Sequence, residues 1–219
     1  MERVQELTQK FVDYSKNLVN NVTERNIPLV TFLNDLLPEY YQFYNNVLAA
    51  FNQEAPAPIS CGPNCGACCS TLVQISPLEA VNIWFHIKKE YTNEQLTRIF
   101  EQLQKRVNIL NKISNFEKID HDELCTLYLK QRIPCLFLTS DQNCSIHHFR
   151  PAICRNHHVV TPPEWCDDIE HIERVKIWRH PNLVSLDVLF QQKLSTYFIG
   201  VSSMGSMQQT LAMYYRFCP

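Results

Sequence analysis

Two cysteine-rich stretches constrain this chain more than any other feature. The first packs four cysteines into residues 61–69, on a loop that also contains glycine and proline, and the second spreads three over residues 135–154. Short spacings on a turn-forming loop let several sulfur atoms converge on one soft metal ion. We therefore predict that seven of the ten cysteines meet in the fold as metal ligands. They are Cys61, Cys65, Cys68, Cys69, Cys135, Cys144 and Cys154.

The expected compartment supports metal ligation over disulfides. The first residues lack the apolar segment of a signal peptide. No apolar run approaches the ~20 residues of a membrane-spanning helix. We therefore expect a cytoplasmic protein that does not enter a membrane. Disulfides are disfavoured in the cytosol, so clustered cysteines there indicate metal ligands or catalytic thiols.

Composition excludes some classes of partner. The chain has 219 residues, 45% of them hydrophobic, which suffices for a globular core. The formal net charge is −2, whereas a general nucleic-acid binder usually carries a basic face. We expect no nucleic-acid partner, and the sequence identifies no protein partner.

Hydrophobic periodicity predicts helices along most of the chain. Apolar residues recur every three or four positions over 2–22, 40–51, 96–110 and 186–197. In the last of these the stripe comprises Leu186, Leu189, Phe190, Leu194 and Tyr197. Further helices are expected over 121–131 and 206–215, and Pro38 should restart a helix after a break at residues 26–28.

Two capping boxes indicate where a pair of helices begins. Ser76-Pro77-Leu78-Glu79 and Thr92-Asn93-Glu94-Gln95 each place a hydroxyl residue three positions before an acid or amide. The two helices are expected to pack as an antiparallel hairpin. Capping is a sufficient role for Glu79, so we assign it no catalytic function.

The predicted fold class is mainly α, an irregular helical domain with a small β-hairpin beside the cysteine-rich metal-binding loop. The hairpin is expected over 136–147 and would hold Cys135 near Cys144. We expect residues 1–58 to form N-terminal helices that pack on the core. Residues 59–166 should form the cysteine-cluster domain, and 167–219 should add C-terminal helices to the same globular unit.

The cysteine pattern resembles the YkgJ-type cysteine-cluster (CxxCxxCC) family, whose members are described as zinc- or iron-chelating. That family shows C-x2/3-C-G-x-C-C, a helix-opening Glu, P-C-x-F-L, and C-x-I-Y-x-x-R-P-x-x-C-R. The matching residues are Cys61, Cys65, Gly66, Cys68, Cys69, Glu79, Pro134, Cys135, Phe137, Leu138, Cys144, Ile146, Arg150, Pro151, Cys154 and Arg155. The chain departs from the pattern at His147, where the family has Tyr, and at Asn156-His157-His158.

Other residues near the motifs are candidates for supporting roles. His157, His158 and Cys166 are possible additional metal ligands. Arg150 and Arg155 flank Cys154 and could offset the negative charge of a metal–thiolate centre. We predict Cys125 to be a buried core thiol.

Seven thiols exceed the four that one tetrahedral zinc ion uses, and three arrangements follow. Two zinc ions could share sulfurs, one ion could use four thiols, or an iron–sulfur cluster could use four. We expect zinc, with iron or an iron–sulfur cluster as the alternative, and a site closed by protein ligands.

The leading functional prediction is a cytosolic metal-binding protein, with an iron–sulfur redox protein or enzyme as the alternative. A weaker alternative is a methyltransferase-related enzyme, because flagellin lysine methylases contain a related cysteine cluster. No Ser/His/Asp order, phosphate loop or paired-carboxylate motif stands out, so the sequence assigns no catalytic residue.

Overall fold

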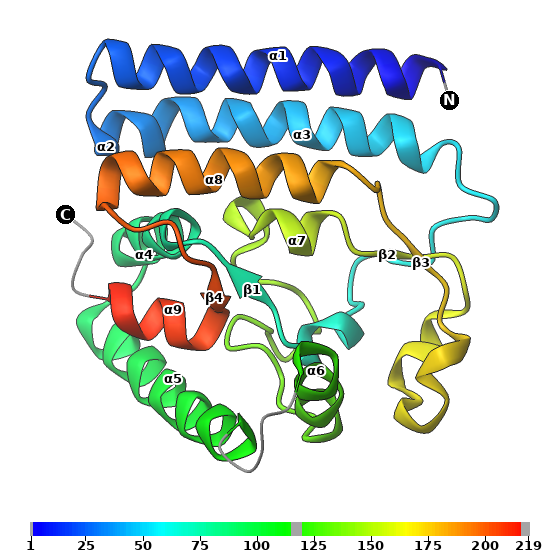
Figure 1. The fold of residues 1–219 in the computed structure, drawn as a ribbon. Helices are drawn as coiled ribbons and strands as arrows, with labels where there is room; N and C mark the ends of the chain where they lie inside the picture. Colours follow the sequence, from blue (N-terminus) through cyan, green and yellow to red (C-terminus); the bar gives the residue numbers. More distant parts are fainter. Residues whose placement is uncertain (1, 115–119, 216–219) are drawn as a thin grey trace.

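The computed structural model describes residues 2–114 and 120–215, and within them the chain is mainly helical (Figure 1). The α-helices are α1 (Glu2–Glu24), α2 (Leu29–Thr31), α3 (Leu37–Asn52), α4 (Pro77–Glu90), α5 (Asn93–Ser114), α6 (His121–Lys130), α7 (Ala152–Arg155), α8 (Leu183–Ile199) and α9 (Met207–Tyr214). The strands are β1 (Gln74–Ile75), β2 (His158–Val159), β3 (Ile177–Trp178) and β4 (Gly205–Ser206). Short 3-10 turns are η2 (Ala67–Ser70), η3 (His147–Phe149), η4 (Pro163–Asp167) and η5 (Ile169–Arg174).

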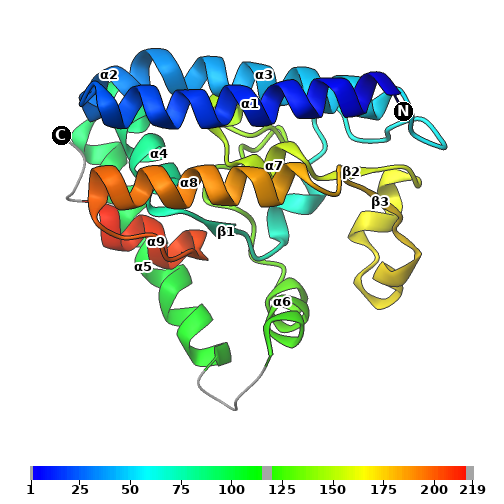
Figure 2. The ribbon, with the colours of Figure 1, turned by 45° about the horizontal axis from the view of Figure 1, so that its top comes forward.

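Helices α1, α3 and α8 run side by side and pack against one another as a three-helix bundle (Figures 1 and 2). Aromatic side chains fill the space between them. Tyr40 of α3 stacks on Phe190 of α8 with ring centroids 3.8 Å apart, and Phe11 of α1 lies 5.1 Å from the Tyr40 ring. An aromatic pair of this kind adds about 0.5–1.5 kcal/mol to the burial of its surface. Aromatic contacts of this kind therefore join the three helices.

The break predicted at residues 26–28 is present, but the helix restarts earlier than Pro38. Asn26 has φ of 50°, and the chain becomes helical again at Leu29. A π-helical turn, η1 (Phe32–Leu36), precedes α3, with the Leu37 N–H bonded to the Phe32 carbonyl. Pro38 has no N–H to donate, which explains why the regular helical ladder is interrupted there.

Helix α4 lies in the middle of the fold and is buried on almost every side. The Ser76 capping box that begins it is fully formed, as predicted. Its main partners are α8 and α9, and Trp84 donates a hydrogen bond of 2.8 Å to the Leu211 carbonyl of α9. Helix α9 also packs along α5, so it occupies the place that an α4–α5 hairpin would have filled.

Two antiparallel sheets of two strands each join distant parts of the chain. Strand β1 pairs with β4, opposing Gln74 to Ser206, and β2 pairs with β3, opposing His158 to Trp178. The hairpin expected over 136–147 is reduced to one bridge between Leu138 and Cys144. Each sheet therefore pairs one strand near the cysteine motifs with one strand of the C-terminal segment.

Helix α8 forms as predicted, but its buried face differs from the predicted stripe. Leu189 is 57% exposed and Tyr197 is 38% exposed. Asp187, Gln191 and Ser195 are buried instead. These polar groups can be buried because other helices supply hydrogen-bond partners, such as the Tyr40 hydroxyl, which donates to Asp187 at 3.0 Å.

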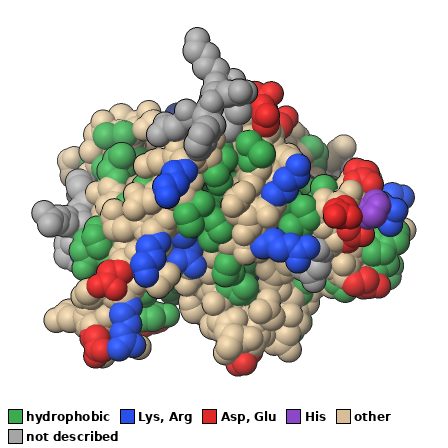
Figure 3. All heavy atoms as spheres, turned by 90° about the horizontal axis from the view of Figure 1, so that it is seen from below, with side chains coloured by type: hydrophobic (Ala, Val, Ile, Leu, Met, Phe, Trp, Pro, Cys, Tyr) green, Lys and Arg blue, Asp and Glu red, His purple; other side chains and the backbone are tan. Residues whose placement is uncertain are grey.

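A single large hydrophobic cluster includes residues of all three segments distinguished in the sequence, among them Phe11, Trp84, Phe137 and Phe190. Within the described ranges no helix is long and apolar enough to cross a membrane. On the face shown in Figure 3, basic and acidic side chains are interspersed with apolar ones.

Candidate metal centre

The first cysteine loop is folded by tight turns. The Cys65 N–H bonds to the Gly62 carbonyl at 3.3 Å, and Asn64 between them has φ of 61°. Cys68 and Cys69 then lie on the 3-10 turn η2, where the Cys69 N–H bonds to the Gly66 carbonyl at 2.9 Å. Asparagine tolerates positive φ better than most residues, which suits it to this loop.

Backbone and side-chain bonds join the first loop to the second. The Cys135 N–H donates to the Cys69 carbonyl at 2.6 Å. Asn143 accepts from the Asn64 N–H at 3.1 Å and donates to the Asn64 side chain at 2.8 Å. Gly66 is buried against the second loop, because a Cβ atom there would lie 2.7 Å from Leu138 Cδ1. These contacts hold cysteines about seventy residues apart in sequence on the same loop assembly.

Cys154 lies on the short helix α7. Glu79 anchors this helix. Its carboxylate accepts from the Ser76 N–H at 2.8 Å, as a capping box requires, and from the Ala152 N–H at 3.1 Å. One buried carboxylate thus ties the start of α4 to the start of α7, a structural role beyond capping.

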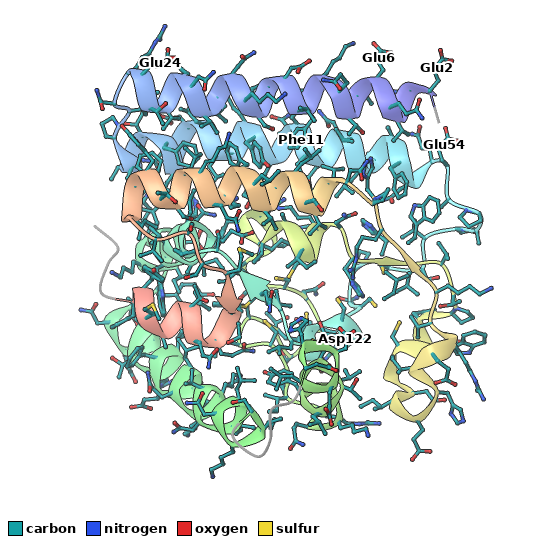
Figure 4. All side chains as sticks on the ribbon, viewed as in Figure 1. Glu2, Glu6, Phe11, Glu24, Glu54 and Asp122 are labelled. Carbon is teal, nitrogen blue, oxygen red and sulfur yellow. The ribbon has the colours of Figure 1, made fainter. Side chains whose placement is uncertain are left out.

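All seven predicted cysteines line one cavity of about 730 Å³. Cys166, His157 and His158, the possible additional ligands, line it too, as do His147 and Arg150. The remaining wall is largely apolar and includes Leu103 and Met207. In Figure 4 sulfur atoms, drawn in yellow, gather between α7 and α6. As the side chains lie, no three His, Cys, Asp or Glu groups in the described part of the chain are close enough together to hold a metal ion.

Burial keeps most of these thiols protonated in the metal-free protein. It raises the pKa of Cys61, Cys144 and Cys154, and raises the pKa of Cys135 to about 11. Cys68 differs, because a hydrogen bond with Cys69 and the charge of Arg150 lower its pKa to about 7, and the same bond raises the pKa of Cys69. Cys68 is also the exposed member of the set. It is therefore the thiol most readily ionised at neutral pH.

The imidazoles that line the cavity are held in the neutral form that metals bind. Burial lowers the pKa of His147 and His158, and with the nearby charge of Arg179 it lowers the pKa of His157 to about 4. Arg179 lies 2.9 Å from Nδ1 of His157, so that nitrogen is already occupied.

The two arginines predicted to flank the centre act differently. Arg150 lines the cavity, and its buried Nε has no hydrogen-bond acceptor among the described residues. Arg155 instead points to the backbone, donating to the carbonyls of His148 at 2.6 Å and Arg150 at 2.9 Å. Its guanidinium also lies 4.3 Å from the centre of the Tyr41 ring. Arg155 therefore holds the loop in place, and only Arg150 is positioned to face the thiols.

Cys125 is not the core thiol that was predicted. It is half-buried on α6, and its sulfur lies 3.5 Å from Nε2 of His121. The four-residue separation of His121 and Cys125 on a helix already places both side chains on one face. Cys218, the tenth cysteine, lies outside the described residues.

Comparison with known proteins matches the CxxCxxCC family model, described as "Putative zinc- or iron-chelating domain", to residues 60–176. This match covers more than half of the chain and includes all seven predicted ligands and Cys166. Searches of curated proteins and of solved structures found no match.

Proposed function

Because the chain belongs to the CxxCxxCC family, we propose that it binds zinc in the cytosol through the clustered cysteines. The observation that carries this proposal is that seven thiols from two loops and helix α7 line one cavity. Thiolates are soft ligands that favour zinc and iron over the hard cations magnesium and calcium.

The number of thiols supports a centre with more than one ion or with spare ligands. A tetrahedral zinc ion takes four ligands, so three of the seven thiols would remain or would bridge to a second zinc. A zinc ion with four thiolates carries a formal charge of −2. The Nε–H of Arg150, which lacks an acceptor among the described groups, can donate to one of these sulfurs and offset part of that charge.

Metal binding at this centre must displace protons. Burial favours the neutral thiols at Cys135 and Cys154, whereas a metal binds the thiolate. Cys68, whose pKa is lowered to about 7, would supply the first thiolate, and a bound metal cation would lower the pKa of the other thiols. Each ion bound should therefore release several protons near neutral pH, and affinity should fall as the pH is lowered.

An iron–sulfur cluster is the second candidate, because four of the seven thiols that line the cavity would satisfy a cluster. Its iron would bring redox chemistry that zinc does not.

Metal analysis of anaerobically purified protein, with its absorption spectrum, tests the proposal. A colourless protein that contains zinc supports the first candidate, and a brown protein with iron and sulfide supports the second. Cys65→Ser and Cys154→Ser should each lower the content of tightly bound metal, whereas Cys125→Ser, outside the large cavity, should leave it unchanged. Tight metal that survives both cavity substitutions would overturn the proposal.

A further inference from the structure

Helix α6 carries a second pair of metal-binding side chains that the seven-cysteine centre does not use. His121 and Cys125 stand four residues apart, so they share one face of the helix. The His121 Nε2 and the Cys125 Sγ lie 3.5 Å apart. In Figure 4 the labelled Asp122 marks this end of α6.

The separation of these two atoms suits a shared zinc ion. A tetrahedral zinc with bonds of about 2.3 Å to sulfur and about 2.0–2.1 Å to nitrogen holds the two atoms about 3.6 Å apart. We propose that His121 and Cys125 form a separate, exchangeable binding site for a thiophilic divalent metal ion such as zinc. Two protein ligands leave two positions for water or an incoming ligand, unlike a closed structural site.

Gln74 of β1 holds the imidazole of His121 from the other side. The Nε2 atom of the Gln74 amide lies 3.4 Å from the Nδ1 atom of His121. The oxygen and nitrogen of an amide exchange places when it rotates by half a turn. With its oxygen toward His121 the amide accepts the Nδ1 proton, which leaves the lone pair of Nε2 for a metal. A hydrogen bond to the ring nitrogen that does not bind the metal commonly orients a metal-binding histidine in this way.

The cavity beside the pair leads to the main centre. His121 and Cys125 line a cavity of about 420 Å³ together with Cys68, Cys154 and His157. The last three also line the larger cavity. Figures 1 and 2 both place α6 next to the turn before β1 that carries Cys68. A metal ion held by the pair therefore lies in a space that is bounded by ligands of the centre.

This connection assigns the pair a role in loading the centre, and that role rests on the proposed function. Cys68 and Cys154 line both cavities, and their thiolates can replace the water ligands of the ion one at a time. No oxidant or reductant is needed, because the metal keeps its charge and each thiol gives up a proton to solvent.

Cobalt(II) absorption tests the pair as a binding site. Cobalt(II) is added anaerobically to the full-length protein that already holds its tight metal, and the thiolate-to-cobalt charge-transfer band is followed. Wild type and the control His171→Gln, a histidine on η5 outside both cavities, should show the band. Cys125→Ser should show a weaker band than both of these proteins, and His121→Gln should weaken cobalt binding by about tenfold or more. Equal binding by all four proteins would show that the pair makes a hydrogen bond only.

Two further measurements separate the pair from the main centre. Serine at 125 can still hydrogen-bond to His121, so the melting curve of Cys125→Ser should match wild type; if that variant does not fold, His121→Gln decides the question. The double variant Cys65→Ser, Cys154→Ser should lose tight metal yet keep the cobalt band, because the pair does not need those thiols. The content of tight metal therefore tests the proposed seven-cysteine centre, whereas the cobalt band tests the His121–Cys125 pair.

The loading role is tested by the rate at which metal-free protein takes up zinc. His121→Gln should take up zinc several-fold more slowly than His171→Gln and reach the same tight content. Equal rates would overturn the loading role.

Discussion

Replacing Gly66 by alanine should push the two cysteine loops apart. The Cβ atom would lie 2.7 Å from Leu138 Cδ1 and 2.7 Å from Gln142 Oε1, whereas carbon atoms in contact are normally about 3.5–4.0 Å apart. Leu138 would have to retreat by about 1 Å. The backbone itself is not strained by alanine, because Gly66 has φ of −105° and ψ of 7°. The effect is therefore steric.

The size of the effect follows from the packing. Inserting a methyl group into a filled site destabilises by about 1–3 kcal/mol. Removing a glycine also restricts the unfolded chain, which returns about 0.4–1 kcal/mol. Gly62 provides a matched control in the same loop, because nothing lies within 4 Å of a Cβ built there. The unfolding free energy of Gly66→Ala should therefore lie about 1–3 kcal/mol below that of Gly62→Ala.

Urea unfolding and competition with a metal chelator measure this difference. Gly66→Ala should lose metal to the chelator sooner than Gly62→Ala, because displacing Leu138 also moves Cys144, its bridge partner. Adding Leu138→Ala to Gly66→Ala should restore part of the metal affinity by making room for the methyl group. Equal stability and equal metal retention in Gly66→Ala and Gly62→Ala would refute the argument that close packing at Gly66 joins the loops.

Three other perturbations test separate parts of the site. Asn143→Ala removes both side-chain bonds to Asn64 and should destabilise the loop contact by about 1–2 kcal/mol, seen as faster metal release than in the loop variant Ser140→Ala. In the metal-free, reduced protein the pKa of Cys135 is raised to about 11, whereas a thiol of the unfolded chain has a pKa near 8.5. Because the unfolded chain therefore loses its proton first as the pH rises, the unfolding free energy should fall between about pH 8.5 and 11. A fall with pH no steeper than that of Cys135→Ser would contradict this. Removing the metal should unfold the cysteine loops before the bundle of α1, α3 and α8, as measured by hydrogen exchange, and a uniform loss of protection would contradict this.

Local signals in the sequence predicted the local features correctly. The Ser76 box begins α4 because its hydroxyl and the Glu79 carboxylate bond to nearby backbone, which needs no information from elsewhere. The cysteine spacings predicted that seven thiols meet as metal ligands; the structure places all seven on one cavity, and their ligation of a metal stays a prediction.

Features that depend on distant partners could not be predicted in this way. Gln74 pairs with Ser206 in strands of two residues each, too short for any alternation to show. The polar face of α8 is buried because Tyr40 and Ser76, from other parts of the chain, bond to Asp187 and Gln191. Likewise, apolar neighbours suggested that Cys125 belonged to the core, and only the fold shows that it is half-buried and that Gln74 of β1 lies against the neighbouring His121.

X-ray absorption at the metal edge of the anaerobically purified protein tests most directly whether the clustered thiols hold the metal. For zinc, ligation by the converging cysteines predicts a first shell of mostly sulfur at about 2.3 Å, with four ligands per ion. The sulfur contribution should fall in Cys65→Ser and Cys154→Ser and persist in Cys125→Ser. A first shell of nitrogen and oxygen alone, or a sulfur shell unchanged by the first two substitutions, would contradict ligation by these cysteines.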